Sequence, residues 1–153
     1  MKTNEIATIL NHILSTDKVN FLGVFPQDLI PSFDSLKFPA CLVSNTDPSS
    51  KPGTHWVALY LVSPSHLTFF DRFGLHPNAY GFMFNVSMYN KTQLQSFSSN
   101  VCGEYCIYYL FKRSKCICPI FKEFSSSTDW NDRQVAKWFK KISNSMSPHS
   151  LPC

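Results

Sequence analysis

Residues 98–111 read SSNVCGEYCIYYLF, a short polar run that changes abruptly into aromatic and apolar residues. The polar run predicts a loop, and the apolar run predicts a buried helix that begins at Cys102. The first turn of a helix carries partial positive charge, which favours a thiolate over a thiol. Cys102 is therefore a candidate nucleophile, and a distant histidine could supply the base that it needs.

The composition is typical of one globular domain. The chain has 153 residues, of which 44% are hydrophobic and only 16% are charged, so it can bury a substantial core. Its longest apolar stretches, such as residues 56–62, are far too short to cross a bilayer, and no secretory signal is evident at the N-terminus. We expect a single intracellular domain over residues 1–153, monomeric and without a membrane partner, whose tail from 143 to 153 is frayed.

Cysteine usage and charge exclude several other classes of protein. A chain of this size and apolar content needs no disulfide framework, so free thiols in a reducing compartment are expected at its six cysteines, Cys41, Cys102, Cys106, Cys116, Cys118 and Cys153. The formal net charge of +4 permits weak attraction to DNA, but no run of Lys or Arg argues for a nucleic-acid interface. We expect no cofactor.

Periodicity and turn residues predict an α+β domain with a small, mostly antiparallel sheet packed against helices. The apolar spacing predicts a first helix over residues 4–15 capped by Asn4, and a last helix from Asp129, its cap, to Ile142. Three prolines predict irregular or broken extended structure over residues 21–40. The other expected elements are strands at 40–43, 56–62, 67–73 and near 82–88, a helix over 102–112 and a loop over 116–127.

The two clearest strands form a predicted hairpin. Residues 56–62 and 67–73 are dense in β-branched and aromatic residues, and the polar link of residues 63–66 suits an antiparallel turn. His55 then stands at the start of the first strand and Asp71 late in the second. Because these two ends of an antiparallel pair lie next to each other, we expect His55 and Asp71 to be neighbours.

These residues fit the requirements of nucleophilic catalysis. A thiol needs a base within hydrogen-bond reach, and the base needs a group that orients it. His55 is the candidate base for Cys102, and Asp71 is the candidate orienting group. When a thiolate attacks a carbonyl, hydrogen-bond donors must also meet the oxyanion that forms. The backbone N–H of Cys102 and the amide of Gln95 could donate, and Gln93 is a rival for the second role.

At these positions the chain resembles the adenain family of viral cysteine proteases, which belongs to a clan that also includes SUMO and ubiquitin-like proteases. The order His, acidic residue, Gln, Cys is the order of that clan, whereas papain-like enzymes place Cys first. The resemblance spans roughly residues 6–112 and, more weakly, the final helix. It rests on GTHW at 53–56, FFDRFG at 69–74, QS at 95–96 and CGEYC at 102–106, with FLGVF at 21–25 and ACLV at 40–43.

The resemblance implies a papain-like core in permuted chain order. It also implies cleavage of viral precursor proteins at sites with small residues, typically glycine, in the host nucleus or the virion. The implied general base, acidic member, oxyanion-hole amide and nucleophile are His55, Asp71, Gln95 and Cys102. The substrate-binding residues expected beside them are Gly53, Trp56 and Gly103.

Three departures from the adenovirus enzymes bear on these expectations. Asp71 stands where those enzymes generally carry Glu, although the SUMO-protease branch uses Asp. The stretch between Gly74 and Gln95 is shorter than in adenain, and it lacks the cysteine through which adenain binds an activating peptide. We therefore expect no disulfide-linked activating peptide, while a non-covalent one remains open. The shorter chain suggests a virus or a virus-like transposon outside the adenoviruses.

Other interpretations remain beside the protease. A ubiquitin-like or SUMO deconjugase of the same clan shares every residue of the motif. Asp71 could instead form a salt bridge with Arg72. A zinc-binding interaction module could use four thiols, although their spacing is wrong for the usual zinc knuckles; these are Cys102, Cys106, Cys116 and Cys118.

Overall fold

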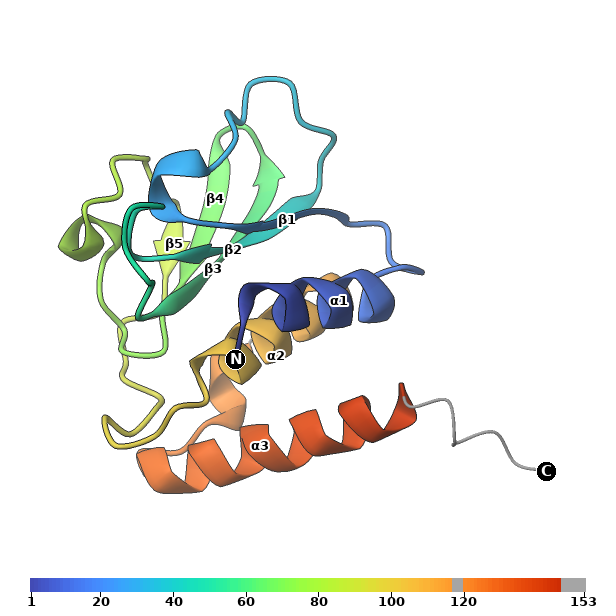
Figure 1. Ribbon diagram of the computed structural model, residues 1–153, viewed down its shortest axis with the longest axis vertical. Helices are drawn as coiled ribbons and strands as arrows, with labels where there is room; N and C mark the ends of the chain where they lie inside the picture. Colours follow the sequence, from blue (N-terminus) through green and yellow to red (C-terminus); the bar gives the residue numbers. More distant parts are fainter. Residues whose placement is uncertain (117–119, 147–153) are drawn as a thin grey trace.

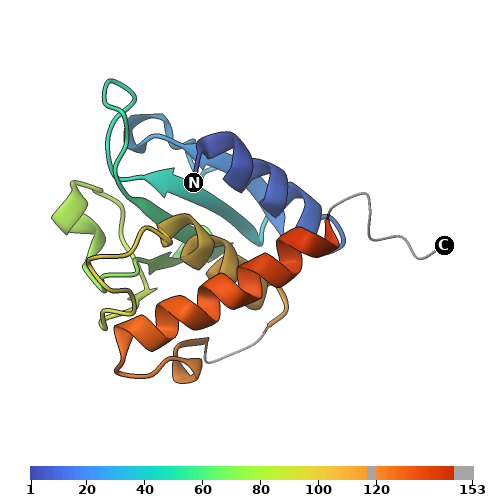
Figure 2. The same ribbon diagram turned by 60° about the horizontal axis from the view of Figure 1, so that its bottom comes forward.

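The computed structural model describes residues 1–116 and 120–146, which fold as an α+β protein with a five-stranded mixed sheet. Figure 1 shows α1 and α2 between the sheet and α3, and Figure 2 shows α3 crossing the outer side of α2. The elements are α1 (Thr3–Ile13), β1 (Asn20–Phe25), β2 (Ala40–Asn45), β3 (Trp56–Ser63), β4 (His66–Phe70), β5 (Met88–Tyr89), α2 (Cys102–Ser114) and α3 (Thr128–Ser145). Short 3-10 helices cover Gln27–Leu29, Pro77–Tyr80 and Ile120–Glu123.

The sheet has the strand order β1-β2-β3-β4-β5. The predicted hairpin is confirmed, because β3 pairs antiparallel with β4 and also with β2. The sheet expected to be mostly antiparallel is mixed, since β1 runs parallel to β2 and β5 runs parallel to β4. Both parallel strands reach their places through long irregular connections, and no local turn signal in the sequence marks such pairings.

Each face of the sheet covers a separate cluster of apolar side chains. Every residue of β2 is buried, and its first four residues, 40–43, are all apolar. The helices cover one face, where α2 packs over β3 and the ring of Tyr109 stacks on that of Phe70. Apolar side chains of β1, of the connection over residues 30–38 and of residues 80–86 pack on the other face. With both faces covered, the middle strands of the sheet are held rigidly. His55 and Asp71 lie at the ends of two of these strands, β3 and β4.

Several strand boundaries differ from the expectation. Residues 20–25 form a regular strand with a bulge between Phe21 and Gly23, although the prolines downstream suggested broken structure. These prolines act only after the strand, from Pro26 onward, where the chain leaves the sheet. β4 ends at Phe70 and not at 73, and the strand expected near 82–88 is the short pair Met88–Tyr89.

The helices were predicted more accurately than their caps. Lys2 and not Asn4 occupies the N-cap position of α1, and its backbone N–H donates to the Glu5 carboxylate at 2.6 Å. Ser127 and not Asp129 caps α3, since its hydroxyl accepts from the backbone N–H of Trp130 at 3.3 Å. Runs of polar residues, 2–5 and 125–129, span the starts of both helices, so composition alone leaves several residues able to cap.

Helix α3 is longer than predicted and packs as expected. It continues to Ser145, three residues beyond the predicted end at Ile142, and residues 147–153 of the expected tail lie outside the described residues. The apolar spacing of this helix predicts a buried face of Val135, Trp138, Phe139 and Ile142. The first three pack against the main core, whereas Ile142 is half-buried and lies outside that cluster. The expected loop over 116–127 contains the 3-10 helix at 120–123, and residues 117–119 lie outside the described part.

The turn after β4 depends on Gly74. Its φ of +72° lies in the left-handed region, and an added Cβ would stand 2.7 Å from the backbone of Thr92. Gly74→Ala should therefore lower the free energy of unfolding by at least about 2 kcal/mol. The matched control is Gly81→Ala, which has a similar φ of +81° but meets only Gln27 at 3.4 Å. Urea denaturation of both variants tests this, and equal losses would contradict the proposed clash with Thr92.

Candidate active site

The β3–β4 hairpin brings His55 and Asp71 together. His55 immediately precedes β3 and Asp71 immediately follows β4, and the register pairs Ala58 with Phe70 between them. Nε2 of His55 lies 2.7 Å from Oδ1 of Asp71, and both residues are buried. The predicted adjacency of these two side chains is confirmed.

Asp71 sits among hydrogen-bond donors that favour its ionised form. Besides His55, its carboxylate accepts from the backbone N–H groups of Phe73 at 3.2 Å and Leu75 at 2.9 Å, and from the Tyr80 hydroxyl at 2.8 Å. Burial alone would raise the pKa of Asp71, but these bonds and the neighbouring imidazole outweigh it and lower the pKa. The carboxylate is therefore held as an acceptor for the N–H of His55.

The backbone of Asp71 is fixed as firmly as its side chain. Asn90 accepts from the Asp71 N–H at 2.9 Å, and its amide donates to the Asp71 carbonyl. The imidazole of His55 is held by rings, stacking on Phe73 with centroids 5.1 Å apart and lying 5.5 Å from Tyr80. Positioning of this kind lets a histidine keep one tautomer and one orientation.

Cys102 is the first residue of α2, and its thiol interacts with His55 and with the backbone of Trp56. Burial would raise the pKa of Cys102, but the neighbouring imidazole of His55 and the positive charge of Arg72 reverse this and lower the pKa. Burial would lower the pKa of His55, whereas its bond with Asp71 and the neighbouring thiol of Cys102 raise the pKa. Both shifts favour a thiolate next to an imidazolium.

The second ring nitrogen of His55, Nδ1, is free to exchange a proton with the Cys102 thiol. Nε2 is bound to Asp71, while Nδ1 is buried and has no well-formed hydrogen bond within the described residues. Hydrogen bonds between a nucleophile and its base are often long or poorly aligned before substrate arrives. Nδ1 can thus take the proton of Cys102 while Asp71 holds Nε2.

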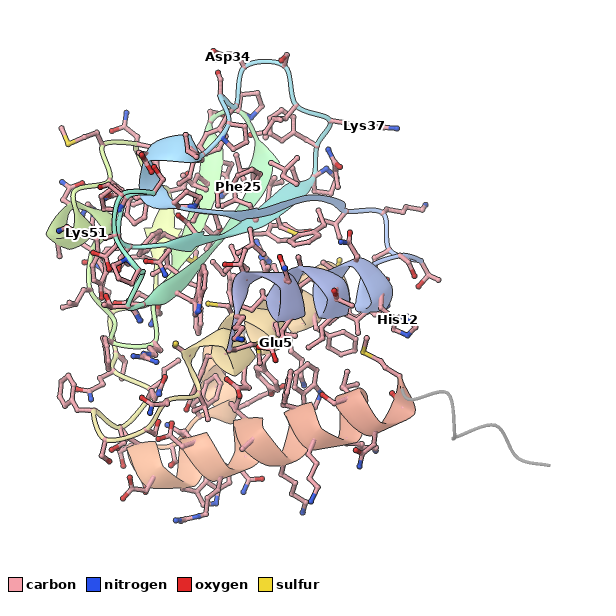
Figure 3. All side chains as sticks on the ribbon, in the orientation of Figure 1. Glu5, His12, Phe25, Asp34, Lys37 and Lys51 are labelled. Atoms are coloured by element: carbon pink, nitrogen blue, oxygen red, sulfur yellow. The ribbon has the colours of Figure 1, made fainter. Side chains whose placement is uncertain are left out.

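Cys102 opens onto a cleft of about 690 Å³. Gly53 and Trp56 line this cleft, as expected of substrate-binding residues, whereas Gly103 does not. Gly103 is buried instead against Met1 and Ile6, where an added Cβ would come within 3.0 Å of the Met1 sulfur. Residues of β1 and of the loop before β3 also line the cleft. Phe25 and Lys51 are among them and are labelled in Figure 3.

Gln95 is placed differently from the other three predicted residues. It is fully buried and does not line the cleft, and its amide nitrogen donates to the Ser99 carbonyl at 2.8 Å and the Ser99 hydroxyl at 2.6 Å. Its rival Gln93 donates to the carbonyl of Gln95 at 2.8 Å. The structure thus brings His55, Asp71 and Cys102 together and engages both amides elsewhere, so the oxyanion role of Gln95 stays a prediction.

Three residues of the site escaped the sequence interpretation. Tyr80 and Asn90 support Asp71 from a stretch whose composition suggested only loop and a strand. Arg72 was considered only as an ion-pair partner of Asp71, but no such ion pair forms among the described residues, and Arg72 lines the cleft instead. Its position directly after the candidate acidic residue was the one signal available.

The Tyr80 hydroxyl gives a direct test of the Asp71 environment. Tyr80→Phe removes one donor from a buried carboxylate and should lower the free energy of unfolding by about 1–2 kcal/mol. Tyr89→Phe is the matched control, because this tyrosine is partly exposed and no hydrogen bond of its hydroxyl is found among the described residues. Urea denaturation measures both, and a Tyr80→Phe protein as stable as the wild type would contradict the bond to Asp71.

Comparisons with known proteins do not show which family this chain belongs to. A scan against protein-family models finds no match, and a search of curated proteins finds none either. Within residues 1–116 and 120–146, no three His, Cys, Asp or Glu side chains are grouped so that they could hold a metal ion. Cys118, one of the four thiols of the zinc interpretation, lies outside that range. No helix in the described part is both long and apolar enough to span a membrane.

Proposed function

We propose that the protein is a cysteine endopeptidase of the adenain type. The observation that carries the proposal is the grouping of Asp71, His55 and Cys102, in which one imidazole is bound to the carboxylate and lies near the thiol. The thiol starts a helix and opens onto a cleft that also contains Gly53 and Trp56. A buried carboxylate, an oriented histidine and a thiol of lowered pKa together form the usual apparatus of thiol acylation.

The reaction follows from this geometry. Nδ1 of His55 takes the proton of the Cys102 thiol, and the thiolate attacks the scissile carbonyl carbon to form a tetrahedral intermediate. Collapse of this intermediate breaks the C–N bond, and His55 returns its proton to the leaving amine, which leaves a thioester on Cys102. Water, deprotonated by His55, then attacks the thioester and releases the carboxylic acid and the thiol. Asp71 holds the imidazole throughout and stabilises its cationic form.

The substrate class rests on the resemblance to adenain. We propose that the substrates are precursor proteins of a virus or a virus-like transposon, cut at sites with small residues such as glycine, in the host nucleus or the virion. The cleft suits an extended peptide, since it is lined by loop residues between 45 and 54 and by the start of α2. Activation by DNA or by a non-covalent peptide remains compatible with the mild positive charge of +4.

A ubiquitin-like protein deconjugase is the second candidate. The observation that favours it is the identity of the acidic residue, since Asp71 matches the SUMO-protease branch of the clan. Both candidates share the same nucleophile and base, so chemistry at Cys102 does not separate them. The two candidates differ in their substrates, because a deconjugase requires a folded ubiquitin-like protein ahead of the scissile bond.

A peptide-library cleavage assay read by mass spectrometry tests the proposal. We expect internal cleavage at glycine-containing sites and no labelling by ubiquitin, SUMO or NEDD8 probes that carry a C-terminal electrophile. Labelling of Cys102 by such a probe without peptide cleavage would favour the deconjugase. Neither cleavage nor labelling, together with a slowly reacting Cys102, would contradict both candidates.

A further inference from the structure

Arg72 is a buried cation in the wall of the catalytic cleft. It follows Asp71 in the turn that leaves β4, and only 8% of its surface is exposed. It lines the same cleft as Cys102, and its guanidinium lies over the ring of Phe73 at 4.3 Å from the ring centroid. Phe73 in turn stacks on His55, so the cation belongs to the immediate surroundings of the proposed base.

Two nitrogens of this guanidinium have no hydrogen-bond partner among the described residues. They are Nε and Nη1 of Arg72, and both are buried. The described ion pairs join other residues, namely His55 with Asp71, Lys112 with Glu123 and Lys115 with Asp17. Leaving a buried charged donor unpaired is costly, so two such atoms in a residue that lines the cleft point to a ligand that arrives with the substrate.

The partner must be an oxygen that carries negative charge. Asp71 is already saturated by His55, two backbone N–H groups and Tyr80, so it has no need of Arg72. Guanidinium donors match oxyanions in geometry and charge. In a cleft whose nucleophile is Cys102, the oxyanion at hand is the one formed when the thiolate attacks a carbonyl.

The other expected donor is occupied. The Gln95 amide is directed to Ser99, with bonds of 2.8 Å and 2.6 Å, and lies outside the cleft lining. The backbone N–H of Cys102 is at the first position of α2, where no partner exists within the helix. One backbone donor is therefore ready, and a second donor is missing unless Arg72 supplies it.

We propose that Arg72 is a catalytic residue whose guanidinium donates to the oxyanion of the tetrahedral intermediate. The inference rests on the proposed endopeptidase function. As Sγ of Cys102 bonds to the carbonyl carbon, the π electrons of the C=O bond move to the oxygen, which Arg72 and the Cys102 N–H then bind. When the intermediate collapses, those electrons restore the C=O bond, the C–N bond breaks, and the amine takes its proton from His55.

The rival role for Arg72 is to stabilise only the thiolate, and two reactions of Cys102 separate the roles. Peptide acylation passes through an oxyanion, whereas alkylation by iodoacetamide uses the thiolate but forms no oxyanion. Arg72→Gln should lower kcat/KM for a cleaved peptide by roughly 10²- to 10³-fold, the usual loss of an oxyanion donor. Its alkylation rate, measured at a pH where the thiol is fully ionised, should stay within about threefold of the wild type.

Two further variants complete the design. Arg133→Gln removes the same charge from an exposed position on α3 and should leave both rates unchanged. Arg72→Lys keeps the charge but loses the planar pair of donors, so its kcat/KM should fall about tenfold or more with normal alkylation. Circular dichroism checks the fold of each variant. If Arg72→Gln does not fold, Arg72→Lys decides the question by the same two rates.

The outcomes are distinct. Unchanged kcat/KM in Arg72→Gln or Arg72→Lys would overturn the inference while leaving the endopeptidase intact. A parallel fall of kcat/KM and alkylation would also overturn it, because it would assign Arg72 to the thiolate. A wild-type protein that cleaves no peptide would contradict the proposed function itself, and Arg72 would then have no oxyanion to bind.

Discussion

Cys102→Ala is expected to abolish peptide cleavage, with kcat/KM lowered by at least about 10⁴-fold. The sulfur is the atom that forms the acyl intermediate, and no other cysteine lines the cleft among the described residues. The side chain is partly buried at the first turn of α2, where alanine fits and suits a helix. The variant should therefore fold normally, as checked by circular dichroism and thermal unfolding.

Cys106 provides the matched control one helical turn further along. It is fully buried in the main core, and burial raises its pKa well above that of a free thiol, so it is an inert packing residue. Cys106→Ala should lose stability because it leaves a small cavity, yet cleave at close to the wild-type rate. Retained cleavage in Cys102→Ala, or complete loss in a folded Cys106→Ala protein, would end the assignment of the nucleophile.

Asp71→Asn is expected to lower kcat/KM by about 10⁴-fold, the loss typical of this substitution in a Ser-His-Asp triad. The carboxylate accepts from Nε2 of His55, which leaves Nδ1 unprotonated and ready for the thiol. An amide can turn its NH₂ group toward Nε2 and so stabilise the opposite tautomer. Stability should fall as well, because an amide offers fewer acceptor sites to the backbone N–H groups and to Tyr80.

Asp17→Asn is the matched control for Asp71→Asn, because it removes a carboxylate that lies away from the candidate active site. The Asp17 side chain is 8% exposed and binds Ser114 and Lys115 at the far end of α2 from Cys102. This variant makes the same change of charge and should lose stability with little change in kcat/KM. Steady-state kinetics and urea denaturation of both proteins test the contrast, and equal effects on kcat/KM would show that Asp71 acts only through the fold.

The core of the site could be predicted from sequence because local signals determine it. Dense β-branched and aromatic residues with a short polar link specify the β3–β4 hairpin, and the hairpin alone places His55 beside Asp71. The polar-to-apolar change at Cys102 likewise marks the start of α2. What joins Cys102 to His55 is the packing of α2 on β3, which spacing cannot show but the resemblance to adenain implied.

The rest of the fold and the site depends on contacts between residues far apart in the chain. The strand β1 becomes regular only by pairing with β2, across a connection that holds three prolines. Asn90 reaches Asp71 across 19 positions, and no motif at Asn90 marks this contact. The burial of Arg72 and its lack of a partner at Nε and Nη1 depend on the residues that surround it in the fold. Its place in the cleft therefore had to come from the structure.

The coupling of Cys102 to His55 is the central claim, and the pH dependence of thiol alkylation tests it most directly. Iodoacetamide modification, followed at each cysteine by mass spectrometry, compares Cys102 with the exposed Cys116 in the same molecule. Because the pKa of Cys102 is lowered, we predict that Cys102 reacts faster than Cys116 and stays reactive below neutral pH. His55→Ala should raise the pH at which Cys102 becomes reactive, so that Cys102 no longer reacts faster than Cys116. A Cys102 that titrates like a free thiol, near pH ~8.5, in both proteins would contradict the account.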